Sequence, residues 1–160
     1  MKRRDVLTSG LALGATAIVS PAIAQETPTI RWRMTSSFPK SLETIYGGGE
    51  MFADRVSKLT DGKFTIRVFA AGDIVPAFQA LDAVQQGTVE ICHTASYYYT
   101  GKDLTFGFGT ALPFGLTARQ QNAWMYHGGG IELLNDFYKA YNVIAYPAGN
   151  TGAQMGGWFR

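Results

Sequence analysis

Two amide side chains near the end of the sequence are its best candidates for holding a small molecule. Asn150 and Gln154 stand among glycines, in the stretch 150–160 that also contains an aromatic pair and a final arginine. Glycine lets a backbone approach a ligand closely, and amides supply donors and acceptors in fixed positions. The other interpretation is that both amides satisfy backbone groups where the chain crosses between domains. The Gln154 oxygen also suits a hard cation such as sodium.

A second candidate is the aromatic run Tyr97-Tyr98-Tyr99. It follows an expected strand, where aromatic rings can cover a small ligand and offer hydroxyl hydrogen bonds. We expect one ring, Tyr98, to face a pocket. The alternative is that the run contributes to the hydrophobic core.

Catalytic patterns are weak in this sequence. Cys92 and His93 are neighbours in an expected strand, so their side chains point to opposite faces and cannot readily pair. His127 is the only other histidine, and zinc-type spacing is absent. No dinucleotide-binding, phosphate-loop or nucleophile-elbow motif occurs. We therefore predict a protein that is not an enzyme and has no catalytic residue.

Alternating strands and helices must position these residues. The pattern predicts three strands, at 30–35, 64–70 and 89–94, separated by helices at 42–59 and 77–86. This order implies right-handed crossovers and a parallel sheet in an α/β fold. Ligands in such folds bind beyond the carboxyl ends of the strands. Those ends lie at 36–40, 70–76 and 94–100.

The first helix carries an unusual glycine triplet at 47–49. Three helical glycines cost roughly 2–3 kcal/mol against alanine, which indicates either close packing on the sheet or a ligand contact. We expect Ser41 to cap this helix and Gly62 to end it. Its spacing predicts these inward positions: Leu42, Ile45, Tyr46, Gly49, Phe52, Val56 and Leu59.

The second half of the sequence is less regular. The stretch 105–115 is apolar and rich in glycine, and we expect an extended or irregular segment that passes under the domain. Thr117 should cap a helix that ends near His127, and 131–141 should form another, separated by the glycines at 128–130. Strands are expected at 142–147 and 154–160, which makes the sheet parallel-rich but mixed.

Residues 1–24 have the features of an export signal. Lys2-Arg3-Arg4 is a charged start, 7–20 is mildly apolar, and Ala22-Ile23-Ala24 is a small-x-small cleavage site. The apolar run is shorter than the roughly 20 residues of a membrane span, and the paired arginines are similar to a twin-arginine signal. We expect a soluble periplasmic product that begins at Gln25, with no direct membrane insertion after cleavage.

Charge and cysteine content limit the partners. Removing the three cations and one acid of the signal takes the formal net charge from +2 to 0, so nucleic acid and acidic membranes lose their electrostatic attraction. The single cysteine cannot form an internal disulfide, so packing must stabilise the domain.

Several stretches together resemble one family. These are YGGGEMFA at 46–53, GDIVP at 72–76, DAVQQGTVE at 82–90, PFG at 113–115 and NTGAQMGGWF at 150–159. From about Thr29 onward the chain is similar to the periplasmic solute-binding subunit of TRAP transporters, the dicarboxylate-binding type. The first and last stretches resemble the branch that binds 2-oxo acids such as pyruvate together with sodium.

The resemblance implies two periplasmic-binding-protein-like α/β lobes that close on an organic acid and deliver it to a membrane permease. An arginine would pair with the ligand carboxylate, but that arginine lies beyond the end of this sequence, and Arg160 is not it. Gln154 matches an amide that contacts metal and ligand, and Asn150 lies just before it. A dimer would be possible only for the full-length protein.

The expected organisation is a signal at 1–24, a first lobe at 25–147, and a crossover with the start of a second lobe at 148–160. We expect this sequence to be the first part of a longer protein or a truncated product. Two alternatives stay open: a twin-arginine-exported oxidoreductase, and a fragment of a binding protein that does not function alone. No cofactor is expected apart from the sodium ion.

Overall fold

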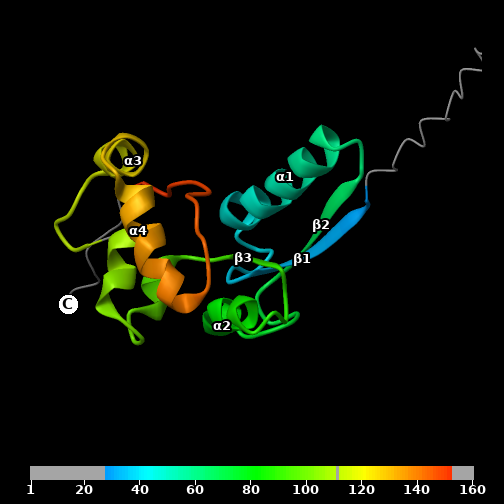
Figure 1. Ribbon diagram of the computed structural model, residues 1–160, viewed down its shortest axis with the longest axis horizontal. Coiled ribbons are helices and arrows are strands. Elements are labelled where there is room, and N and C mark those ends of the chain that lie inside the picture. The colour runs from blue at the N-terminus through cyan, green and yellow to red at the C-terminus, as the bar shows by residue number, and fades with distance from the viewer. Residues whose placement is uncertain (1–27, 111, 153–160) are drawn as a thin grey trace, which may run out of the picture.

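A three-stranded parallel sheet organises the first half of the chain. The computed structural model describes residues 28–110 and 112–152. Strands β1 (Ile30–Ser36), β2 (Phe64–Phe69) and β3 (Ile91–His93) lie in the order β2-β1-β3, and both ladders are parallel. The α/β class with helices flanking a parallel sheet is therefore confirmed (Figure 1). No antiparallel ladder occurs between the described strands.

Helix α1 (Glu43–Leu59) covers one face of the sheet between β1 and β2 (Figure 1). Its buried residues are Tyr46, Gly49 and Ala53, a narrow helical stripe. The prediction that Leu42, Phe52 and Leu59 point inward is wrong, since all three are exposed and Leu59 is 85% exposed. Two long strands support the helix, and they bury only the middle of its apolar face.

The start of α1 also differs from the prediction. Leu42, not Ser41, occupies the N-cap position, and no side chain caps the helix there. The Leu42 carbonyl accepts the amides of Ile45 and Tyr46 instead. At the other end Gly62 adopts φ +75°, as expected for a left-handed helix terminator.

The second crossover passes over the opposite side of the sheet (Figure 1). It consists of the 3₁₀ turn η1 (Ala77–Gln79) followed directly by α2 (Ala80–Gln85), and Gly87 ends it with φ +70°. Because β3 pairs with β1 and not with β2, the two crossovers diverge between β1 and β3. That divergence is the topological switch point of the sheet.

The second half of the described chain is a helical layer facing the carboxyl ends of the strands (Figure 1). It contains η2 (Ser96–Tyr99), η3 (Leu104–Gly109), α3 (Ala118–His127), α4 (Gly130–Tyr138) and η4 (Lys139–Tyr141). Thr117 caps α3 as predicted and forms a full capping box with Gln120. Gly129, with φ +78°, separates α3 from α4.

Two expectations for this half are wrong. Residues 104–109 form η3 where an extended or irregular segment was expected, because Phe106 is drawn into the core and is only 1% exposed. Residues 142–147 form no strand. There the Asn135 side chain donates to the Ala145 carbonyl at 3.0 Å and accepts the Ala145 amide at 2.8 Å, which takes the place of a strand partner.

Two hydrophobic clusters stabilise the fold. The larger surrounds Phe106, which packs on Tyr99, Phe137, Tyr138 and Tyr141. The smaller joins the β1 end to α1 and β2 through Phe38, Tyr46 and Ala70. Tyr98 packs against both clusters and so links the sheet to the helical layer. Within residues 28–110 and 112–152, no helix has the length and apolar character to span a membrane.

Candidate functional site

The carboxyl ends of β1 and β3 form the best candidate site. The Ser37 amide donates to the His93 carbonyl at 2.9 Å, so the two strand ends stay paired past the last ladder residues. The Ser36 hydroxyl accepts the Phe38 amide at 3.1 Å, which turns the chain away from the sheet. These contacts place side chains of two strands beside the switch point, where α/β folds bind ligands.

Four aromatic rings line this end of the sheet. Tyr98 stands at their centre, with ring centroids 4.6 Å from Tyr97, 5.0 Å from Phe78 and 6.2 Å from Phe38. Tyr98 is half-buried, while Phe78 and Tyr97 are exposed. The sequence predicted that Tyr98 would face a pocket. In the structure Tyr98 packs against both hydrophobic clusters and is partly accessible, and its role in facing a pocket stays a prediction.

Burial, together with a hydrogen bond to Tyr97, raises the pKa of Tyr98 to about 12. Its hydroxyl therefore keeps its proton at neutral pH and can donate to an anionic ligand.

His93 lies on the α1 side of the sheet. Its ring meets Phe38 edge-on at 5.1 Å, and its Nδ1 lies 3.5 Å from the Ser36 hydroxyl oxygen. A Cβ added to Gly49 of α1 would lie 3.1 Å from the same nitrogen. Burial lowers the pKa of His93, so the ring is neutral at pH 7. This packing explains Gly49 of the triplet, whereas Gly47 and Gly48 face open space.

The environment of Cys92 is not that of a nucleophilic cysteine. Burial raises the pKa of its thiol to about 11, which leaves it protonated and inert at neutral pH. Among the described residues, no three His, Cys, Asp or Glu side chains gather into a group that could hold a metal ion.

The two predicted amides are at the far end of the described chain. Asn150 is exposed, and its Oδ1 accepts the Gly152 amide at 2.8 Å in a local turn. Gln154 lies outside the described residues, so its predicted role in ligand and sodium binding stays a prediction. The expected signal at 1–24 and the last expected strand also lie outside them.

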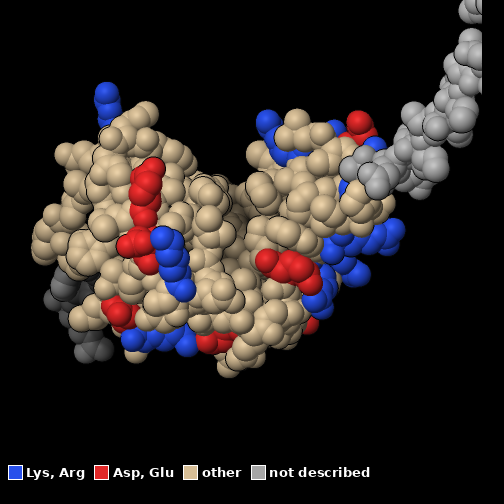
Figure 2. All heavy atoms as spheres, in the orientation of Figure 1, with Lys and Arg blue, Asp and Glu red and all other residues tan. Residues whose placement is uncertain are grey.

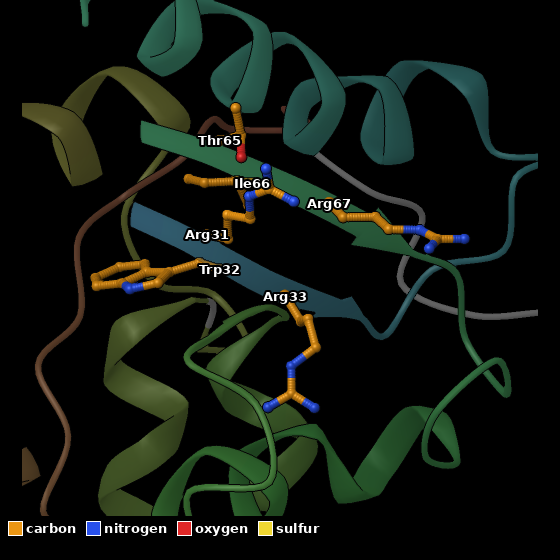
Figure 3. A pocket seen from close by; sticks show the side chains of 6 residues that line it. All are labelled: Arg31, Trp32, Arg33, Thr65, Ile66 and Arg67. Carbon is orange, nitrogen blue, oxygen red and sulfur yellow. The ribbon is translucent and has the colours of Figure 1, made fainter. Parts of the chain in front are cut away.

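A second concave surface lies on the sheet itself. A cavity of about 560 Å³ is lined by Arg31, Trp32, Arg33, Thr65, Ile66 and Arg67 (Figure 3). All six residues belong to the first four positions of β1 and β2. Arg33 there pairs with Glu90, which precedes β3. This cavity lies away from the carboxyl ends of the strands and from every residue that the sequence singled out.

The molecular surface separates into two masses in Figure 2, with a hollow between α1 and the helices α3 and α4. Residues visible in this hollow are uncharged, and Lys and Arg gather instead around the β1–β2 end. An uncharged hollow with a few convergent polar groups is typical of a small-molecule site.

Comparison with known proteins decides the family. The family of bacterial extracellular solute-binding proteins, family 7 (DctP), matches residues 35–160. The chain belongs to this family. The resemblance to TRAP transporter solute-binding subunits is thereby confirmed, and the oxidoreductase alternative finds no support. The family is one of binding proteins rather than enzymes.

One curated relative is a 2-oxo acid-binding protein. The chain is 53% identical over 167 residues to a monocarboxylate 2-oxoacid-binding periplasmic protein of Nostoc, and the match covers all of this chain and 46% of that protein.

Two solved TRAP solute-binding proteins share the fold. One, from Bordetella bronchiseptica, holds calcium and picolinate; it is 53% identical, with a TM-score of 0.80, and the match covers 84% of this chain and 40% of that one. The other, from Pseudoalteromonas atlantica, holds sodium and pyruvate; it is 40% identical, with a TM-score of 0.79, and the match covers 82% and 40%. The chain thus spans less than half the length of these relatives.

Sequence reasoning missed part of the site. Phe78 was inside a predicted helix and was not singled out, although it stands next to Tyr98. Ser37 and Thr94 were within the segments expected at strand ends but received no role. The available signal was their position, because small hydroxyl residues at the carboxyl ends of β1 and β3 meet at the switch point.

Proposed function

We propose that this chain provides the first lobe, 25–147, of an extracytoplasmic solute-binding protein that captures a small 2-oxo acid such as pyruvate. The single observation that carries the proposal is the aromatic group around Tyr98 at the carboxyl ends of β1 and β3. Family membership and relatives that hold pyruvate support the ligand class.

Tyr98 would act as a hydrogen-bond donor. A tyrosine hydroxyl is protonated at neutral pH, so it can donate to a carboxylate or keto oxygen. Phe78 and Tyr97 would cover the apolar part of the ligand and exclude water. The buried Cys92 thiol stays protonated at neutral pH and is not a nucleophile, and in this proposal the ligand leaves unchanged.

Asn150 and Gln154 would complete the ligand contacts from 148–160, the proposed crossover into a second lobe. The bond from the Gly152 amide uses one lone pair of the Asn150 oxygen, and an amide side chain offers a second lone pair and two donor hydrogens. Cleft closure would then couple ligand affinity to the population of the closed state.

A sodium ion is a candidate co-ligand. The ion would need oxygen ligands, and no acidic cluster in the described part competes for that role. Amide oxygens such as that of Gln154 fit a monovalent hard cation, which would offset the negative charge of the organic acid. The ion is proposed from the amides and from the relatives, one of which holds sodium with pyruvate.

The proposed location is the periplasm, with a TRAP-type membrane permease as the partner that receives the ligand. The deciding experiment is calorimetric titration of pyruvate, other 2-oxo acids and C4-dicarboxylates into the protein expressed from its full reading frame, with and without sodium. Sodium-dependent binding of a 2-oxo acid is the expected result. Binding of a dicarboxylate alone would correct the ligand class, and binding of no acid would overturn the proposal.

A further inference from the structure

Three side-chain hydroxyls form a continuous chain beneath the aromatic group. The Ser37 hydroxyl oxygen lies 2.6 Å from the Ala77 carbonyl and 2.7 Å from the Thr94 hydroxyl. Thr94 in turn lies 2.9 Å from the Tyr99 hydroxyl, which accepts the Leu81 amide at 3.2 Å. Ser37 and Tyr99 are buried, and Thr94 is half-buried.

The Ser37 hydroxyl has donor geometry toward two acceptors, the Ala77 carbonyl and the Thr94 hydroxyl. Thr94 and Tyr99 share the next hydrogen bond, in which either hydroxyl can donate, and Tyr99 accepts the Leu81 amide. Connected hydroxyls of this kind polarise one another, and removing one member leaves buried groups without partners.

The hydrogen-bonded chain of hydroxyls begins and ends on the same helical segment. Ala77 lies in η1 and Leu81 in the first turn of α2, four residues apart. Four residues is the spacing of an α-helical hydrogen bond, and here the 3₁₀ turn passes into the α-helix between these two residues. A 3₁₀ turn of this kind is common at the N-terminus of an α-helix. The hydroxyls of Ser37, which follows β1, Thr94, which follows β3, and Tyr99 in η2 connect the two ends of this junction.

This junction carries one wall of the candidate site. Phe78 stands in η1 beside Ala77, and Tyr98 stands in η2 beside Tyr99, with 5.0 Å between their ring centroids. The hydroxyl chain thus fixes the backbones that hold both rings, without either ring taking part in it.

We propose that Ser37, Thr94 and Tyr99 are positioning residues that hold Phe78 and Tyr98 in the geometry that binds the ligand. The ligand part of this proposal rests on the proposed function. The geometric part concerns the unliganded protein and can be tested without any ligand.

The test compares Thr94→Val, which removes the hydroxyl at nearly constant volume, with Thr94→Ser, which keeps it. Thr88→Val makes the same change at an exposed site as a matched control. The readouts are the near-ultraviolet circular dichroism of the unliganded full-length protein, the melting temperature, and the affinity for pyruvate. We expect Thr94→Val to alter the tyrosine dichroism and weaken binding about tenfold, the effect of a little over 1 kcal/mol, which is the size of one hydrogen bond. Thr94→Ser should restore both, and Thr88→Val should change neither.

A purely structural role would lower the melting temperature and leave affinity unchanged. An Ala83→Gly variant, destabilised in the middle of α2, supplies that comparison. If Thr94→Val keeps both the dichroism and the affinity of the parent, or loses affinity no more than Ala83→Gly, the proposal is overturned. If Thr94→Val does not fold, Ser37→Ala takes its place with the same readouts. If the parent protein binds no organic acid, the proposed function fails, while the dichroism still decides whether the hydroxyls hold the rings.

Discussion

The Glu90 carboxylate binds both the side chain and the backbone of Arg33. Its Oε1 accepts Nη2 of Arg33 at 2.7 Å, and its Oε2 accepts Nε at 3.2 Å and the Arg33 backbone amide at 2.7 Å. Strand β3 pairs with β1 only from Met34 onward. Glu90 therefore replaces a strand partner at Arg33, where the β1 edge would otherwise present an open amide.

This contact predicts a pH-dependent stability. The hydrogen bonds from Arg33 lower the pKa of Glu90 from its ordinary value of 4.5 to about 2. A depressed pKa contributes stability above 4.5, and that contribution is lost as the pH falls toward 2. We expect the urea midpoint of the parent to fall more steeply between pH 4.5 and 2 than that of Glu90→Gln. Parallel curves for the two proteins would contradict the assignment.

Neighbouring glycines in α1 should respond oppositely to alanine. Gly48 faces open space, so Gly48→Ala should raise the free energy of unfolding by about 1 kcal/mol through helix propensity. Gly49→Ala would place a Cβ 3.1 Å from His93 Nδ1 and 3.3 Å from Met34 Sδ. We expect it to be less stable than Gly48→Ala by at least about 1 kcal/mol, because close packing offsets the propensity gain. Equal stability of the two variants by chemical denaturation would argue against the packing role of Gly49.

Thr35 offers a stabilising substitution. Its hydroxyl is fully buried and has no hydrogen-bond partner among the described residues. Because a buried hydroxyl without a partner carries an uncompensated desolvation cost, Thr35→Val should raise the free energy of unfolding by about 1 kcal/mol. Thr94→Val, the same chemical change at a hydroxyl with two partners, should lower it. A loss of stability in both variants would show that the Thr35 hydroxyl has a partner.

The amide near the end of the sequence gives a binding prediction. Gln154→Ala should weaken binding of a 2-oxo acid by the full-length protein and reduce its dependence on sodium, because an oxygen ligand is lost. Titration calorimetry in sodium and in choline buffers measures both effects. Asn150→Ala is the companion variant and should weaken binding without a matching change in sodium dependence. Unchanged affinity and unchanged sodium dependence in Gln154→Ala would remove that residue from the site.

Local signals in the sequence were sufficient for much of the fold. Alternation predicted the strands of the parallel sheet, and Gly62, Gly87 and Thr117 stand at helix ends where backbone freedom or a side-chain cap is needed. These features depend on a few adjacent residues. The place of Tyr98 just beyond the carboxyl end of β3 was also predicted from the order of elements, while its role in ligand binding stays a prediction.

The wrong predictions share one cause: they depend on contacts between segments that are distant in the sequence. Phe52 and Leu59 fit the helical period, but both are exposed. Their burial depends on how far the sheet extends beneath the helix, and the sequence of α1 itself does not determine that extent. Residues 142–147 have the composition of a strand, but a strand exists only where a partner does. In the site, Phe78 and the hydroxyl chain depend on tertiary contacts of Ser37, which follows β1. Ser37 bonds to Ala77 in η1, 40 residues away, and to Thr94 after β3, 57 residues away.

The bond pair between Asn135 and Ala145 has a consequence for proteolysis. A single side chain provides both main-chain bonds at Ala145, and Ile144 and Tyr146 on either side are exposed. A rotamer change of the Asn135 side chain would break both bonds to Ala145. The backbone around Ala145 could then enter a protease active site in extended form, without disruption of either hydrophobic cluster. Pro147 blocks chymotrypsin cleavage after Tyr146, so the test uses proteinase K, a protease of broad specificity. Limited digestion should nick the polypeptide first within residues 143–146, and Asn135→Ala should make that cut faster.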